Sequence, residues 1–224
     1  MVGANAGDGR MARLVLAAAI LGGVSYVLSW SLHLPLAGST AWKGSGVALL
    51  AVYAGLKARS LDGRLICVVM GFGALGDMLL EVLGLIPGAL AFLAGHLVAI
   101  GLYLRNRRPA PGLSARLLAA VIVPVTVITA FLLPADRAGA PGVALYALGL
   151  SVMAATAWLS RFPRYQVGAG ALMFLASDLL IFARSGPLHG ATWVGLAIWS
   201  LYFGGQVLVC LGVTRTLRAP SSAP

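Results

Sequence analysis

Long apolar runs alternate with short polar segments along the whole chain. Each apolar run approaches the ~17–25 residues that a helix needs to cross a bilayer. Eight runs come close to this length, the second and fourth being slightly short, and the predicted spans are 11–30, 42–56, 65–83, 88–104, 113–133, 142–159, 167–183 and 191–213. The pattern therefore predicts an all-α fold, in which a polytopic membrane protein forms a bundle of eight transmembrane helices.

The spans leave no room for a separate soluble domain. Residues 1–10 are polar and rich in glycine, so we expect a disordered N-terminal tail there. Residues 11–213 are predicted to form a single transmembrane domain, and residues 214–224 a short basic C-terminal tail.

Composition supports a membrane protein. The chain is 60% hydrophobic and 10% charged, whereas a soluble domain has about 25% charged residues. The net charge of +10 is compatible with nucleic acid, but the basic residues lie between apolar segments and not on one face. We therefore expect a lipid bilayer and no nucleic acid as partner. Cys67 and Cys210 lie inside predicted spans, which indicates reduced packing residues rather than a disulfide or a metal site.

The distribution of basic residues predicts the orientation. If the N-terminus is cytoplasmic and the chain crosses eight times, thirteen of the sixteen Lys and Arg residues lie on the cytoplasmic side. The remaining three are Lys43, Arg137 and Arg184. This bias follows the positive-inside rule. We expect both termini to be cytoplasmic and the protein to lie in a bacterial inner membrane.

Two spans carry acidic residues deep in apolar sequence. Asp77 lies in LICVVMGFGALGDMLLEVL, with Glu81 one turn later, and Asp178 lies in GAGALMFLASDLLIFAR. Such an acid costs ~2.5–3.5 kcal/mol on insertion scales and usually faces a bundle interior, where it acts. Counted from the predicted cytoplasmic ends, the two aspartates lie about 18 Å and about 16 Å along their helices. We predict that they meet in one water-poor chamber, where one carboxyl stays protonated as an acid and the other acts as a base.

Small residues precede both aspartates. Gly71, Gly73 and Gly76 come before the first, and Gly168, Gly170 and Ser177 before the second. Small residues let helix backbones approach closely. Their role is either packing alone or the close approach of the two acids, and both interpretations remain open.

Further polar residues complete the set of candidates. His96 and Tyr103 share one helix face, and Tyr202 and Gln206 are spaced i, i+4, so each pair either links helices or belongs to the site. Near the external ends, Lys43 and Arg184 either bind a phosphate or snorkel, and Glu81 also lies near an external end. The catalytic candidates are Asp77, Asp178 and His96, and the substrate-binding candidates are Lys43, Glu81, Tyr103, Arg184, Tyr202 and Gln206.

No phosphate-binding glycine loop, serine elbow or zinc-helix spacing is present. We expect no cofactor and no metal, although a metal held by Asp77, Asp178 and His96 remains open.

Four motifs resemble the YhhN-like lysoplasmalogenase family across spans two to eight. They are GALGDMLLEV, FLAGHLVAIGLYL, GALMFLASDLLIFAR and LYFGGQVLVCLG, in this order. Lys43 stands where the family tends to have a lysine, but glycine follows it here and not proline. The resemblance implies hydrolysis of the vinyl ether bond of lysoplasmalogens, giving a fatty aldehyde and a glycerophospho-ethanolamine or -choline. The expected partner is thus a lysophospholipid.

The paired acids fit this chemistry. A vinyl ether hydrolyses through protonation at carbon and capture of an oxocarbenium ion by water, which needs a general acid and a carboxylate. Asp77 and Asp178 would take these roles in either order, and His96 would orient one of them or relay a proton. Lys43 or Arg184 would hold the phosphate.

Two other classes remain open. An intramembrane aspartyl protease also pairs two membrane aspartates, but Asp77 follows Ala-Leu-Gly and no Pro-Ala-Leu follows Asp178. A proton-coupled transporter of lipids or small molecules would use the carboxylates to bind protons.

Overall fold

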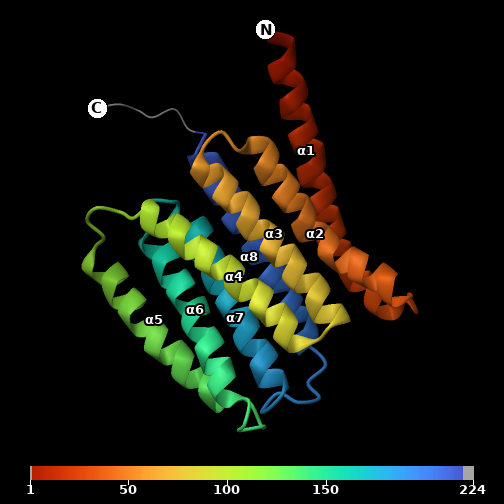
Figure 1. Cartoon of the computed structure of the whole chain (residues 1–224), viewed down its shortest axis with the longest axis vertical. Coiled ribbons are helices and arrows are strands. Elements are labelled where there is room, and N and C mark those ends of the chain that lie inside the picture. Colours follow the sequence, from red (N-terminus) through yellow and green to blue (C-terminus); the bar gives the residue numbers. More distant parts are fainter. Residues whose placement is uncertain (1, 219–224) are drawn as a thin grey trace. The chain divides into compact units, whose positions relative to one another are not determined.

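The computed structural model describes residues 2–218, and the secondary-structure elements of this part of the chain are all helices. A 3-10 helix, η1 (Tyr26–Ser31), follows the first α-helix, and a π-helical turn, η2 (Arg164–Gly168), precedes the seventh. The α-helices are α1 (Val2–Ser25), α2 (Leu36–Lys57), α3 (Leu61–Val82), α4 (Leu85–Arg105), α5 (Leu113–Leu132), α6 (Ala140–Leu159), α7 (Ala169–Arg184) and α8 (Val194–Thr216) (Figure 1). The prediction of an all-α fold with eight long helices is confirmed.

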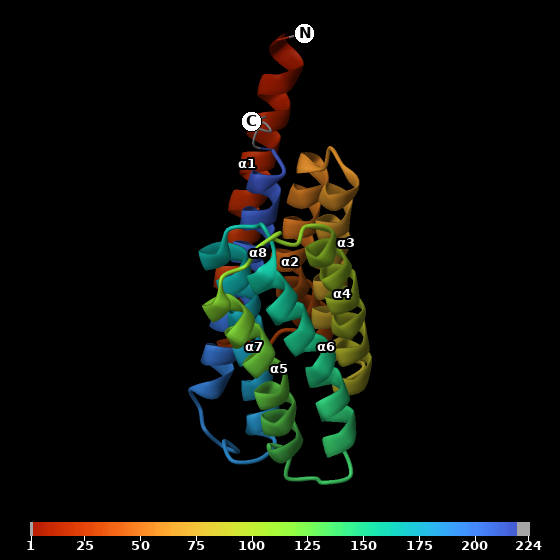
Figure 2. The same cartoon turned by 90° about the vertical axis from the view of Figure 1, so that its left-hand side faces the viewer.

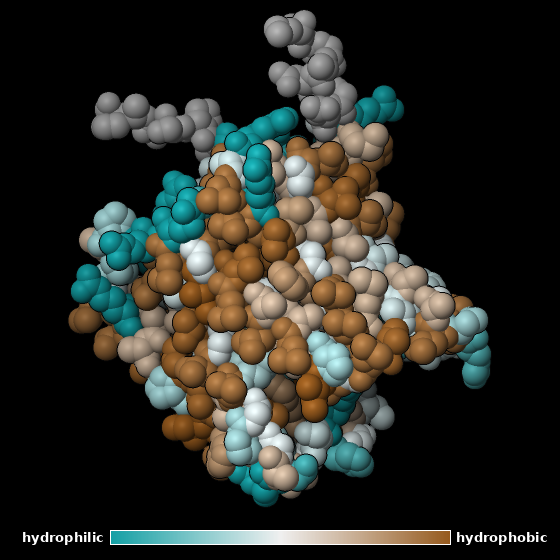
Figure 3. All heavy atoms as spheres, in the orientation of Figure 1, coloured by the Kyte–Doolittle hydropathy of each residue, from teal (hydrophilic) through white to brown (hydrophobic). Residues whose placement is uncertain are grey.

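Seven helical segments among the described residues are long and apolar enough to cross a membrane. They include α3 to α8 and the part of α1 from Gly9 onward, but not α2. Helix α2 is less apolar because its first half carries polar residues, including Lys43. Large apolar side chains are exposed along the helices, and brown apolar residues cover much of the face shown in Figure 3. A lipid environment explains this exposure. The chain is an integral multi-pass membrane protein.

Several helices begin or end a few residues away from the predicted spans. Helix α1 begins at Val2, although we expected a disordered tail over residues 1–10. Once the apolar span forms a helix, each further residue adds a hydrogen bond without a new nucleation cost, so the helix extends backwards. Helix α2 begins at Leu36, directly after Pro35 and before the expected start at residue 42. Helix α8 continues to Thr216, and residues 219–224 of the expected tail lie outside the described residues.

The helices form two compact units. The first contains the chain up to Val98 and the segment from Cys210, and the second contains Ala99–Val209. Helices α4 and α8 contribute residues to both units.

In the first unit, α2 packs against both α1 and α3 (Figure 1). Glycines allow this close packing: a Cβ atom on Gly44 would lie 2.9 Å from Cγ of Met78 on α3. A tight turn at Gly84, with a φ of +91°, joins α3 to α4. This backbone conformation strains residues that have a Cβ atom, so the turn favours glycine.

Helices α3 and α4 interlock through two reciprocal contacts. A Cβ atom on Gly76 would lie 2.8 Å from the ring of Phe92, and one on Gly95 would lie 3.0 Å from Cβ of Phe72. Each helix thus supplies one glycine that accommodates a phenylalanine of its neighbour. Gly76 therefore serves packing, whereas Gly71 has open space beside its Cα atom.

In the second unit, α5 and α6 pack side by side as an antiparallel pair, and α7 packs on α6 (Figure 2). Helices α7 and α8 approach to backbone contact, since a Cβ atom on Gly170 would lie 2.7 Å from the carbonyl oxygen of Gly205. A hydrogen bond links the loops after α4 and α6, in which Arg161 Nε donates to Asn106 Oδ1 over 2.7 Å.

Candidate functional site

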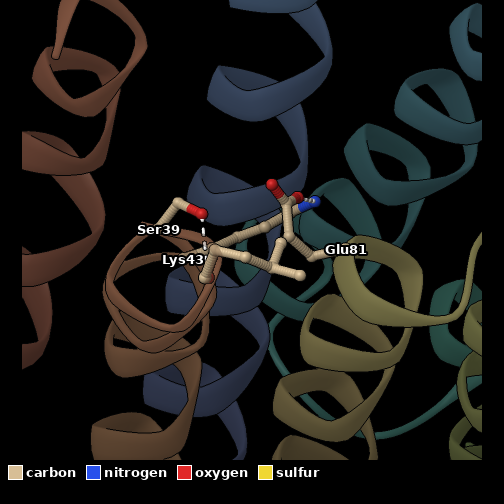
Figure 4. Close-up of polar contacts among 4 residues, drawn as sticks. Ser39, Lys43 and Glu81 are labelled. Atoms are coloured by element: carbon tan, nitrogen blue, oxygen red, sulfur yellow. Dashed lines mark hydrogen bonds and ion pairs between the residues drawn. The ribbon is translucent and has the colours of Figure 1, made fainter. Parts of the chain in front are cut away.

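An ion pair joins α2 to α3 in the first unit. Lys43 Nζ lies 3.0 Å from Glu81 Oε2, and Figure 4 shows the two side chains extended toward each other. Asp77 is one turn away on the same face of α3, an axial rise of about 6 Å. Asp77 is buried, with 3% of its surface exposed. The structure thus brings together two of the predicted binding residues, with a predicted catalytic acid one turn from them.

Tyr26 of η1 joins this group, although sequence reasoning missed it. It is buried, and it interacts electrostatically with Lys43, Glu81 and Asp77. Its ring meets that of Trp30 edge to face, with 6.0 Å between the centroids. A tyrosine inside an apolar span was the only available signal, because no spacing rule connects residues on three separate helices.

The contacts between helices explain why these side chains lie together. Trp42 Nε1 donates to Ser25 Oγ over 3.0 Å, which sets the register between α1 and α2. The contact of Gly44 with Met78 sets the register between α2 and α3. These registers place Lys43 level with the last turns of both its neighbours.

His96 of α4 is also buried, with 4% of its surface exposed. The contacts of Gly76 with Phe92 and of Gly95 with Phe72 offset the Cα atoms of His96 and Asp77 by about 8 Å along the helix axes. Side chains tilt toward the N-terminus of their own helix, so on these antiparallel helices the axial tilts of the two side chains reduce this offset.

The other aspartate has a tyrosine partner in the second unit. Tyr146 Oη of α6 donates to Asp178 Oδ2 of α7 over 2.5 Å, and both residues are buried. Ser177 Oγ donates to the carbonyl oxygen of Ile198 over 3.0 Å, which attaches this part of α7 to α8. Tyr146 was absent from the sequence candidates because its only signal, as for Tyr26, was a single tyrosine in an apolar span.

Tyr202 and Gln206 lie on one face of α8, as their spacing predicts. Each has 4% of its surface exposed, and Gln206 Nε2 lies 3.5 Å from Tyr202 Oη. The ring of Tyr202 meets Phe174 with 5.1 Å between the centroids, and Tyr202 interacts electrostatically with Tyr146. Asp178 therefore belongs to a polar group held by α6, α7 and α8.

The remaining candidates lie elsewhere. Tyr103, with 1% of its surface exposed, packs edge to face on Phe162 with 6.3 Å between the ring centroids. Arg184 is the exposed last residue of α7. Asp77 and Asp178 belong to different units, so their shared chamber stays a prediction. Within the described residues, no three His, Cys, Asp or Glu side chains are grouped so that they would hold a metal ion.

Comparison with known proteins gives one family. The YhhN family matches residues 38–213, which include every predicted site residue but not Tyr26. Two proteins named lysoplasmalogenase, from Mycobacterium bovis (strain ATCC BAA-935 / AF2122/97) and Mycobacterium tuberculosis (strain CDC 1551 / Oshkosh), are similar to the chain. Each is 30% identical over 192 residues, which are 82% of this chain and 73% of the relative. No solved structure matches the chain.

Proposed function

This chain belongs to the YhhN family, and on that premise we propose that it hydrolyses the vinyl ether bond of lysoplasmalogens. The products are a fatty aldehyde and a glycerophospho-ethanolamine or -choline. The observation that carries the proposal is the family match together with two relatives named lysoplasmalogenase. Buried aspartates in apolar helices supply groups that can transfer protons in a membrane.

The reaction consumes one water molecule. A general acid protonates the carbon of the double bond that is not bonded to oxygen. A carboxylate stabilises the resulting oxocarbenium ion. Water then adds to the cationic carbon and gives up a proton, which restores the acid. The hemiacetal formed in this way breaks its bond to the glycerol oxygen and releases the aldehyde.

Asp77 and Asp178 are the proposed acid and carboxylate, in either order. Both are buried, which favours their action in a dry site. Tyr146 is a positioning residue, because its hydroxyl donates a hydrogen bond to Oδ2 of Asp178. Oδ1 is the oxygen proposed to act on substrate or water. His96 is the proposed partner of Asp77, because both are buried on the neighbouring helices α3 and α4.

The substrate contacts remain those expected from the sequence. Lys43 or Arg184 would bind the phosphate. Tyr103, Tyr202 and Gln206 offer hydroxyl and amide groups to the glycerol backbone. We place the enzyme in a bacterial inner membrane with both termini in the cytoplasm, because the loop charges follow the positive-inside rule.

The test is mass spectrometry of a lysoplasmalogen incubated with the detergent-purified protein in D2O. We expect a fatty aldehyde that carries one deuterium on the carbon next to its carbonyl group, because protonation occurs there. The matched control is the 1-O-alkyl lysophospholipid, which lacks the double bond and should remain intact. Absence of aldehyde would refute the proposal. Cleavage of a transmembrane peptide, or counterflow of unchanged lipid, would then favour a protease or a transporter.

Variants test the two acids. Purified Asp77→Asn and Asp178→Asn proteins should each lose aldehyde release by about a hundredfold or more, the usual contribution of a general acid or base. Asp136→Asn, in the loop between α5 and α6, removes the same charge and should stay active. If either of the first two variants is folded and keeps full activity, the two-acid assignment is wrong.

A further inference from the structure

The ion pair of Lys43 and Glu81 is partly exposed. Their side chains are 12% and 28% exposed, and Nζ lies 3.0 Å from Oε2. Glu81 is the penultimate residue of α3, so the pair lies close to the end of that helix. A single charge would be costly in an apolar helix, but here each charge already has an opposite partner.

A ligand that binds here replaces the contact between Lys43 and Glu81, so it suits the pair only if both charges find a new partner. An anion that binds Lys43 displaces the carboxylate of Glu81 and leaves it unpaired beside a second negative charge. A zwitterion supplies an anion to Lys43 and a cation to Glu81, so every charge stays paired. A primary ammonium also donates three hydrogen bonds to a carboxylate, whereas a trimethylammonium has no N–H donor and binds aromatic faces instead.

The position of Asp77 agrees with a lipid bound in this way. Asp77 lies one turn from Glu81 on the same face of α3, about 6 Å along the axis. The glycerol backbone between the phosphate and the vinyl ether is about one helical turn long. A headgroup on the ion pair therefore brings the scissile bond to the level of this carboxyl.

Tyr26 adds a neutral hydrogen-bonding group at the same place. It interacts electrostatically with Lys43, Glu81 and Asp77, and its hydroxyl can both donate and accept hydrogen bonds. It can thus contact the phosphate or the glycerol hydroxyl without adding charge.

We propose that Lys43 and Glu81 form a zwitterion-exchange site for the phosphoethanolamine headgroup, in which Lys43 binds the phosphate and Glu81 binds the primary ammonium. This role in substrate selection rests on the proposed function. The site selects ethanolamine over choline and discriminates most strongly against a bare phosphate headgroup.

Binding of uncleavable analogues tests the site without any reaction. The probes are three 1-O-alkyl lysophospholipids that carry phosphoethanolamine, phosphocholine or phosphate alone, and the dissociation constant Kd is measured for each with detergent-purified full-length protein. We expect the ethanolamine analogue to bind about tenfold more tightly than the phosphate analogue. Glu81→Gln should weaken ethanolamine binding by about tenfold and leave phosphate binding unchanged or stronger. Asp62→Asn, which removes a charge from the first turn of α3, is the matched control and should keep the wild-type order.

A charge-swapped protein controls for loss of the ion pair. Lys43→Glu combined with Glu81→Lys keeps opposite charges on the two helices, so its thermal unfolding should match the wild type. Its preference for the ethanolamine analogue should be lost, because the phosphate and the ammonium now meet like charges. If it keeps the wild-type preference, or if Glu81→Gln weakens all three analogues equally, the pair is only a link between helices and the headgroup site is wrong.

Aldehyde release from the matching vinyl ether lipids is measured in parallel. Headgroup-dependent binding that requires Glu81, without any aldehyde release, would support the site and refute hydrolysis. Aldehyde release with no dependence on Glu81 would support hydrolysis and refute the site.

Discussion

Tyr146 and Asp178, on neighbouring helices α6 and α7, share a hydrogen bond of 2.5 Å in which the tyrosine hydroxyl donates to the carboxyl. Both residues are buried, and the ring of Phe182 packs edge to face on Tyr146 with 5.9 Å between the centroids. The position of this carboxyl is therefore set by a residue 32 positions earlier in the chain.

Removal of that hydroxyl should affect catalysis more than binding. In Tyr146→Phe the ring still fills its place, but the Asp178 carboxyl loses a donor that holds its orientation. We expect kcat for aldehyde release to fall about tenfold or more, with KM changed little. Steady-state kinetics with lysoplasmalogen checks this, and Tyr53→Phe, a buried tyrosine of α2, is the control. A raised KM with an unchanged kcat would contradict the positioning role.

Labelling of single cysteines tests the orientation of the chain. With both native cysteines replaced by serine, Ala138→Cys lies in the loop between α5 and α6, and Ala110→Cys in the loop between α4 and α5. The positive-inside rule predicts that an impermeant maleimide labels the first from outside intact cells. The cysteine of Ala110→Cys should react only after the membrane is permeabilised. The reverse result would invert the orientation.

Backbone contact between α7 and α8 predicts a stability difference between two glycines. Gly170→Ala would force a Cβ atom to within 2.7 Å of the Gly205 carbonyl oxygen, so we expect a loss of about 1–3 kcal/mol of unfolding free energy. A Cβ atom on Gly101 of α4 would have nothing within 4 Å, and Gly101→Ala should be neutral or stabilising by up to about 1 kcal/mol. Thermal unfolding in detergent measures both. Equal effects would show that the helices do not approach this closely.

The tie between the loops after α4 and α6 predicts another stability effect. Asn106 is buried, accepts from Arg161 Nε over 2.7 Å and donates to the carbonyl oxygen of Leu102 over 2.9 Å. Asn106→Ala leaves these groups without their partner, so we expect a loss of about 1–3 kcal/mol. The unfolding temperature of the variant checks this against Arg116→Gln, which changes an exposed residue of α5. An unfolding temperature equal to that of the control would exclude a structural role for this tie.

Periodic and compositional signals account for most of the fold. Apolar length alone predicts helices, and α3 to α8 begin and end close to the predicted spans. The acids were also visible from the sequence, because a carboxylate in an apolar run stands out wherever its helix packs. Helix α1 begins at Val2, because polar composition does not stop a helix that a neighbouring span has already nucleated.

The sequence by itself determined that this chain is a helical membrane protein with aspartates at two deep positions and with the motifs of its family. Only the tertiary structure decided which side chains meet: Tyr146 with Asp178, and Lys43 with Glu81. Helical period tells which residues share a face of one helix. Which faces of different helices come together depends on close contacts such as those of Gly44 and Gly170, and no spacing within a single span encodes them.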